Sequence, residues 1–139
     1  MSGWTELTVA KVEAGLPTDM GALYLTWVEG NPAKASRMAE IIAETVVLFR
    51  EAVITQREVV MDEDPTMIPA TGYRHAFNLA VFNLGMEMGV QFAPEVYSLF
   101  VQANIWLRMV QTGKLRPVPW ETAAEGTPRY TRGKPEFET

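Results

Sequence analysis

The chain has 139 residues, no cysteine and a net charge of −5, with an isoelectric point of about 4.9. Its length suits one domain with a sizeable core. The lack of cysteine excludes disulfides and thiolate metal sites. The excess of acidic residues excludes a broadly basic surface for nucleic acid. The first ten residues lack the basic and apolar regions of a signal peptide, and the apolar run 76–92 is too short and too polar to span a membrane. We therefore expect a soluble cytoplasmic protein.

The first thirty residues predict two short helices. The amphipathic segment from Thr5 to Ala14 is the first, with Thr5 as its N-cap and Gly15 at its end. The second covers about 20–28. Its sequence ALYLTWV is rich in β-favouring residues, so a strand is the alternative; we favour the helix because the surrounding segments read as helical.

Asn31-Pro32 is a helix start signal, because a capping side chain precedes a proline at the first helical position. It predicts a helix over 32–56, about 37 Å long at ~1.5 Å per residue. The apolar residues of its inner face recur at helical spacing, and they are Met38, Ile41, Ile42, Leu48, Phe49, Ala52 and Val53.

Residues 57–70 are predicted to form a loop that contains the acidic run Asp62, Glu63 and Asp64. A calcium loop is excluded, because it needs alternating ligands, a glycine for the sharp turn and a distal glutamate. We interpret the run as solvated, and as a second possibility it faces a channel or a basic partner.

Two helices with little charge follow. The first is capped by Thr71 and ends at Gly89, and the second begins at Pro94 and is stopped by Gly113. Over 71–112 the only formal charges are those of Arg74, Glu87, Glu95 and Arg108. A helix that packs on one core has one apolar stripe and a solvated opposite face. Since these two helices lack that polar face, we expect a further surface to cover them.

The first of these helices has two apolar stripes. One of them contains Tyr73, Phe77, Ala80, Val81, Leu84 and Met88, and the other contains Ala76, Leu79, Phe82 and Met86. Either helices of the same subunit or a neighbouring subunit covers the second stripe. We favour the neighbouring subunit, and Leu79, Phe82 and Met86 are the candidate subunit interface.

The composition changes at Lys114. Residues 114–139 contain four prolines and no helical period, which predicts an extended arm after a helical domain of residues 1–113. Trp120, Tyr130 and Phe137 are spaced along this arm, and aromatic side chains are common anchors at protein interfaces. We expect the domain to self-associate and the arm to dock on a partner through these three residues.

No constellation for catalysis or cofactor binding is visible. His75 is the sole histidine, which does not suffice for a transition-metal site, and glycine-rich phosphate loops and nucleophile elbows are absent. We interpret His75 as a structural or interface residue and expect no enzyme, no cofactor and no metal. A small helical enzyme is the third hypothesis, and it would need a pocket in which His75 meets a perturbed carboxylate.

The order of these segments resembles the head–tail connector (adaptor, head-completion) proteins of tailed bacteriophages. The resemblance covers about 31–119 and rests on pattern and order. Its main parts are the long helix PAKASRMAEIIAETVVLFREAV, the stretch IPATGYRHAFNLAVFNL, the helix APEVYSLFVQANIWLRMVQTGKL with its glycine stop, and the proline-rich tail.

The resemblance implies a homo-oligomeric ring, usually twelvefold, beneath the portal protein in the virion neck, assembled in the host cytoplasm. Such a ring extends the DNA channel and docks the next tail or neck protein, and DNA passes through it without sequence-specific binding. C-terminal segments of these proteins often reach the portal or neighbouring subunits. An acidic bore would let the duplex slide, and Asp62, Glu63 and Asp64 are candidates to line it.

We therefore expect an all-α, non-enzymatic structural protein, a small bundle of three to five helices with an extended C-terminal arm. The alternative is a small helical regulator or protein-binding adaptor that works as a dimer. It would have one symmetric apolar patch, and its tail would be dispensable.

Overall fold

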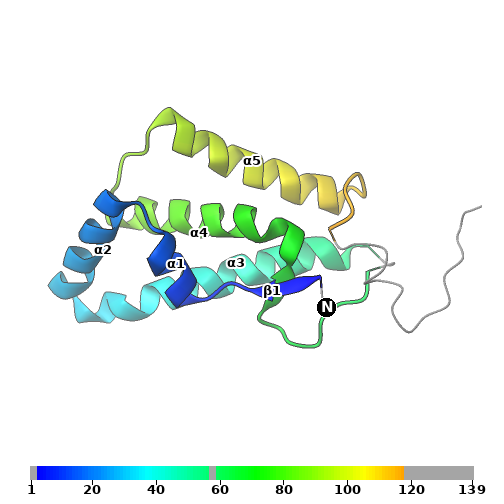
Figure 1. The fold of residues 1–139 in the computed structure, drawn as a ribbon, viewed down its shortest axis with the longest axis horizontal. Helices are drawn as coiled ribbons and strands as arrows, with labels where there is room; N and C mark the ends of the chain where they lie inside the picture. The colour runs from blue at the N-terminus through cyan, green and yellow to red at the C-terminus, as the bar shows by residue number, and fades with distance from the viewer. Residues whose placement is uncertain (1–2, 57–58, 118–139) are drawn as a thin grey trace, which may run out of the picture.

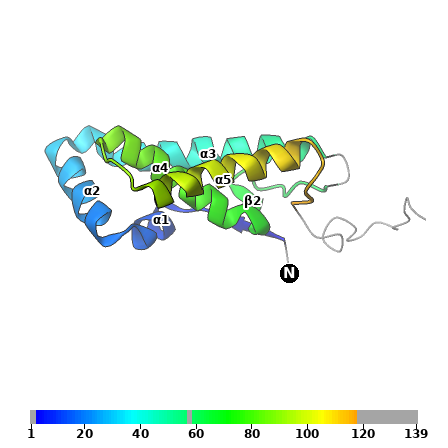
Figure 2. The same cartoon turned by 90° about the horizontal axis from the view of Figure 1, so that it is seen from above.

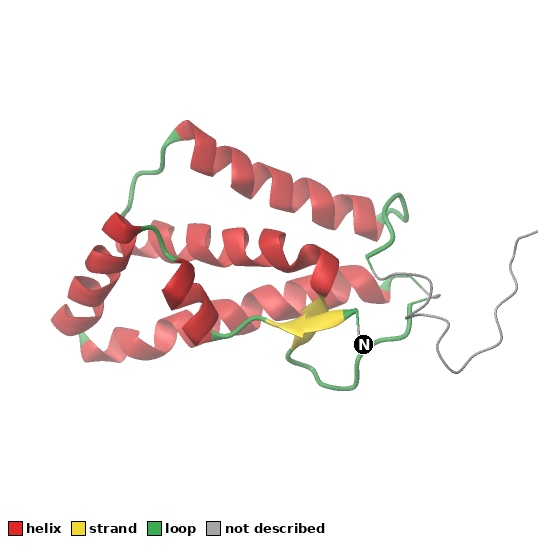
Figure 3. Cartoon of the chain, in the orientation of Figure 1, coloured by secondary structure: helices red, strands yellow, loops and turns green. Residues whose placement is uncertain are grey.

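The computed structural model describes residues 3–56 and 59–117 (Figures 1 and 2). Over this part of the chain the fold is an all-α bundle with one small antiparallel ribbon, which confirms the predicted fold class (Figure 3). The helices are α1 (Val9–Gly15), α2 (Thr18–Gly30), α3 (Arg37–Ile54), α4 (Tyr73–Met88) and α5 (Pro94–Gln111). The strands are β1 (Trp4–Glu6) and β2 (Met67–Pro69), and short 3₁₀ turns over Pro32–Ser36 and Ala70–Gly72 precede α3 and α4.

Helix α4 occupies the centre of the bundle. It lies between α3 and α5, and it also contacts α1 and α2 (Figure 1). Its buried residues surround most of the helix axis, and they are Ala76, Leu79, Ala80, Val81, Phe82, Leu84 and Gly85. The central position explains why a helix with two apolar stripes folds within one subunit, since each stripe meets a different neighbour.

The predicted ends of the last two helices and the predicted start at Pro94 are confirmed by the backbone. The predicted cap at Thr71 is wrong, because the N-cap of α4 is Gly72 and the Thr71 hydroxyl bonds to the carbonyl of Pro117 instead. Gly89 ends α4 with a φ of +79°, and Gly113 follows α5 with a φ of +80°, a conformation in which a glycine avoids the strain of a Cβ atom. Pro94 begins α5. The Asn31 side chain accepts a hydrogen bond from the backbone N–H of Ala33 at 3.1 Å, but the first turn after it is 3₁₀ and the α-helix proper begins at Arg37.

The N-terminal segment differs from the prediction. Thr5 lies in a strand and caps no helix; the N-cap of α1 is Thr8, which accepts from the N–H of Lys11 at 3.2 Å. Strand β1 pairs with β2, with Trp4 opposite Pro69, so part of the predicted loop 57–70 is a strand. The segment ALYLTWV is helical, which confirms the helix that we favoured over a strand.

The long helices share an aromatic core. Phe49 of α3 and Trp106 of α5 stack at 5.4 Å between ring centroids, and both are buried. None of the helices in the described part of the chain is long and apolar enough to cross a bilayer.

Candidate interaction surface

Helix α5 is buried on one side only, and its opposite side is apolar. Four residues at successive four-residue steps lie on this outer side, and they are Tyr97, Val101, Ile105 and Met109. Their exposed fractions are 54, 41, 52 and 36%. Residues four apart are neighbours on a helix surface, so these side chains form a continuous ridge, which we call the α5 ridge.

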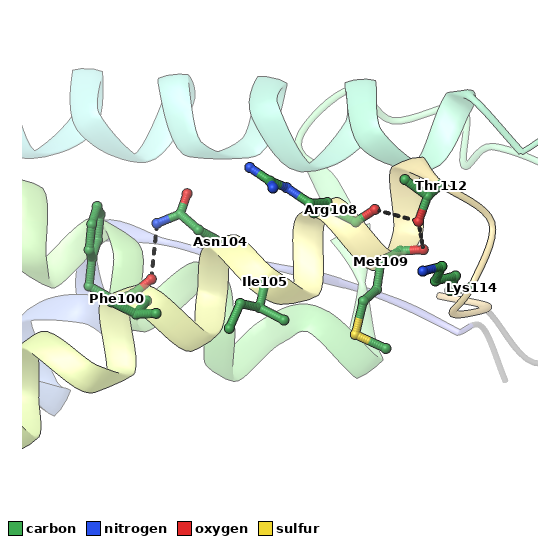
Figure 4. Close-up of a pocket in the computed structure, with 8 residues that line it drawn as sticks. Phe100, Asn104, Ile105, Arg108, Met109, Thr112 and Lys114 are labelled. Atoms are coloured by element: carbon green, nitrogen blue, oxygen red, sulfur yellow. Dashed lines mark hydrogen bonds between the residues drawn. The ribbon is translucent and has the colours of Figure 1, made fainter.

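A shallow groove of about 400 Å³ follows this side of α5 and the turn after it (Figure 4). Its polar side chains are partly satisfied within the helix. Asn104 Nδ2 donates to the Phe100 carbonyl at 3.0 Å, and Thr112 Oγ1 donates to the Arg108 carbonyl at 2.9 Å. Covering these groups therefore costs less than burying unbonded ones.

The charge on this side of α5 has one sign. Between Tyr97 and Lys114 the sequence contains no acidic residue, and Arg108 and Lys114 both line the groove. Neither makes an ion pair with any residue that the structure describes. The surface is thus an apolar ridge with two basic side chains near its C-terminal end.

The outer side of α3 presents a second exposed surface with the opposite charge. Val47 and Ile54 are 53 and 63% exposed on it. Arg37 pairs with Glu40 at 3.0 Å and with Glu44 at 3.5 Å near the start of the helix. Glu51, further along, has no ion pair within the described residues. We call the residues Glu44, Val47, Glu51 and Ile54 the α3 acidic face.

Arg37 also joins α3 to the central helix. Its Nε lies 2.8 Å from both carboxylate oxygens of Glu87 on α4, and a second guanidinium nitrogen contacts the same carboxylate. These hydrogen bonds lower the pKa of Glu87. The contact fixes the N-terminal end of α3 against α4, and with it the direction of the α3 acidic face.

The predicted subunit interface is only partly exposed. Leu79 and Phe82 are 3 and 7% exposed, and Met86 is 59% exposed. Phe82 stacks on Phe92 and Phe100, with ring centroids 5.0 and 4.0 Å apart. Phe82 is thus covered by α5 and the segment before it, and Leu79 belongs to the core of the same subunit. The prediction that these two residues meet a neighbouring subunit is therefore wrong for this fold, and of the three only Met86 is open to a partner.

The acidic run lies on a loop that Arg50 holds in place. The Arg50 guanidinium donates to the carbonyls of Asp62, Asp64 and Met67 at 2.7, 3.0 and 2.7 Å. The Asp64 carboxylate accepts from the N–H and the hydroxyl of Thr66, and these bonds lower its pKa. The carboxylates therefore organise the loop itself, and Glu63 is exposed. No group of three or more potential metal ligands occurs among the described residues.

The three proposed arm anchors, Trp120, Tyr130 and Phe137, lie outside the described residues. The chain leading to them is fastened to the bundle. Gln56 Nε2 donates to the carbonyls of Val110 and Leu115, both at 2.8 Å. The Thr71 hydroxyl donates to the carbonyl of Pro117, which is itself buried. The described chain thus ends at a fixed point beside the bundle.

His75 is part of the packing around Trp106. Its ring stacks on the indole at 5.7 Å, its Nδ1 is buried without a hydrogen-bond partner, and burial lowers its pKa. Among the described residues no carboxylate is bonded to it, and it does not line the groove along α5. This is the environment of a structural histidine.

The α5 ridge was not identified as a separate surface in the sequence, although the scarcity of charge pointed to it. The buried side of this helix consists of Ala103, Trp106, Leu107 and Val110. The signal that could have separated the two sides is the i, i+4 series from Tyr97 to Met109, on the side opposite those residues.

Comparisons of this chain with protein-family models, with curated proteins and with solved structures find no match. The physical surfaces described above are therefore the basis for a functional proposal.

Proposed function

We propose that this chain is a structural, non-enzymatic subunit of a ring, of the kind that head–tail connector proteins form beneath the portal of tailed phages. The main observation behind the proposal is the α5 ridge. Contiguous exposed apolar surface on a small protein marks an interaction site, and burying it is worth roughly 25 cal/mol per Å². The opposite side of α5 already belongs to the core, so the ridge is surplus to what one subunit needs.

In this proposal the ring extends the DNA channel and docks the next tail or neck protein. The net charge of −5 suits a conduit that does not bind the duplex, and Asp62, Glu63 and Asp64 are the candidate channel-facing residues. The segment 118–139 reaches the portal or a neighbouring subunit through Trp120, Tyr130 and Phe137. Its fixed starting point at Pro117 supports this role, because a tether with a defined origin restricts where its anchors can bind.

The direct test is the mass of the full chain by analytical ultracentrifugation, with negative-stain microscopy, in the presence and absence of a phage portal ring. We expect a multi-subunit ring, formed alone or on the portal. A stable monomer that ignores the portal contradicts the proposal.

A dimeric helical adaptor is the second candidate, and the shape of the α5 ridge favours it. One row of four side chains along a single helix can pair with its own copy in an antiparallel, twofold contact. The same ultracentrifugation experiment decides, because this candidate predicts twice the monomer mass at all concentrations above its Kd. Deleting residues 118–139 would then leave partner binding unchanged.

A further inference from the structure

The two exposed surfaces lie on helices of equal length and are complementary in charge. Helices α3 and α5 each have 18 residues, about 27 Å at ~1.5 Å per residue. The α5 ridge is flanked by Arg108 and Lys114. The apolar residues of the α3 acidic face are flanked by Glu44 and Glu51, and also by Arg50, whose guanidinium is bound by three carbonyls of the neighbouring loop.

We infer that the partner of the α5 ridge is the α3 acidic face of a second copy of this chain, so that copies join head to tail. The inference rests on the proposed function, because it names the contact that builds the ring. In this contact Ile105 and Val101 pack on Val47 and Ile54, and Arg108 faces Glu51.

Charge favours this pairing over self-pairing of the α3 acidic face. Two α3 acidic faces in contact bring together glutamates, and two antiparallel α5 ridges place their basic side chains at opposite ends, whereas the mixed contact sets Arg108 against a glutamate. Like charges across an interface suppress the wrong partner, and opposite charges fix the register. Arg108 and Glu51 are suited to this role, since neither has an ion pair within the described part of its own subunit.

The positions of the two helices favour an assembly that grows beyond a dimer. Both α3 and α5 pack on α4 with their buried sides, so their outer sides point in different directions (Figures 1 and 2). A contact between two different surfaces leaves a free α5 ridge at one end of an open oligomer and a free α3 acidic face at the other end. Such an oligomer closes into a ring when the rotation between neighbouring copies permits.

The test is a mixing experiment with two full-length variants. Ile105→Glu disables the α5 ridge, and Val47→Glu disables the α3 acidic face. Both positions are about half exposed, so both variants are expected to fold, which circular dichroism checks. We expect each variant alone to self-associate at least about 100-fold more weakly than the wild type. When the two variants are mixed, they form a one-to-one heterodimer that does not grow further, because only one competent pair of surfaces is present.

The matched control is Leu25→Glu, at a 61% exposed site on α2, and we expect it to leave assembly unchanged.

The outcomes separate this inference from the proposed function. If the wild type forms rings and Val47→Glu does so equally well, the α3 acidic face is not the partner, but the ring stands. If Val47→Glu dimerises alone while Ile105→Glu is monomeric, the α5 ridge pairs with itself and the inference is overturned. A wild type that is monomeric both alone and with the portal overturns the proposed function and the inference with it.

A charge reversal gives an independent readout. Arg108→Glu is expected to weaken assembly about tenfold at low salt, and Glu51→Arg in the same chain is expected to restore it. Absence of rescue, with both single variants defective, would show that the two side chains do not face each other.

Discussion

The indole of Trp106 lies so close to the backbone of Gly72 that a Cβ atom at position 72 would stand 2.6 Å from Cη2 of the ring. The ring has little room to move away, because Phe49 stacks on it at 5.4 Å and His75 at 5.7 Å. Gly72 precedes α4, so this contact joins the start of the central helix to the middle of α5.

Substitution of Gly72 by alanine is expected to lower the free energy of unfolding by about 1–3 kcal/mol, the usual cost of overpacking a core. Urea unfolding of the full chain measures it. The control is Gly21→Ala in α2, where an added Cβ meets nothing within 4 Å. That change is expected to stabilise the protein by roughly 0.5–1 kcal/mol, since alanine is the better helix former. If both variants are equally stable, the close packing at Gly72 is not rigid.

Substitution of Arg50 by methionine is expected to release the loop over 61–66. Three backbone carbonyls lose their charged donor, and each hydrogen bond to a charged group is typically worth about 1.5–3 kcal/mol. Faster hydrogen exchange at the β2 amides, together with a lower urea midpoint, is the measurement. Arg50→Lys is expected to restore only part of the stability that Arg50→Met loses, because an ammonium group cannot span the three carbonyls as the planar guanidinium does. Unchanged exchange at Ile68 would contradict this prediction.

The buried imidazole of His75 predicts a loss of stability in mild acid. Its folded-state pKa lies below the ordinary value of 6.5, so the unfolded chain takes up the proton first as the pH falls. The free energy of unfolding is therefore expected to be constant above about pH 7 and to decrease below pH 6.5 until the folded protein is also protonated. His75→Phe is expected to remove this slope in urea unfolding, since the chain has no other histidine. A slope that persists in His75→Phe must come from other groups.

Deletion of residues 118–139 is expected to leave the bundle folded, because the described hydrogen bonds that fasten the C-terminal segment end at Pro117. Under the proposed function the truncated chain no longer binds the portal ring, while its melting temperature stays within a few degrees of that of the full chain. The triple variant Trp120→Ala, Tyr130→Ala, Phe137→Ala in the full chain tests whether the aromatic side chains are responsible. Full portal binding by the truncated chain would show that the arm is dispensable.

The sequence alone determined the helix class and most helix ends, because these depend on local chemistry. Asn31 caps the chain before Pro32, Pro94 begins a helix, and Gly89 and Gly113 adopt the positive φ that stops one. Each of these signals acts within a few residues, so the local sequence is sufficient to predict the helix end.

The tertiary structure alone decided which apolar residues are covered. Leu79 and Phe82 looked available in the sequence, but the fold buries both within one subunit, Phe82 against α5, and leaves the α5 ridge outside. The pairing of Trp4 with Pro69 was likewise invisible, since strands of three residues have no measurable period and their partners lie far apart in the chain. Local propensity specifies that a helix forms, whereas the order in which helices stack specifies which of its sides meets water.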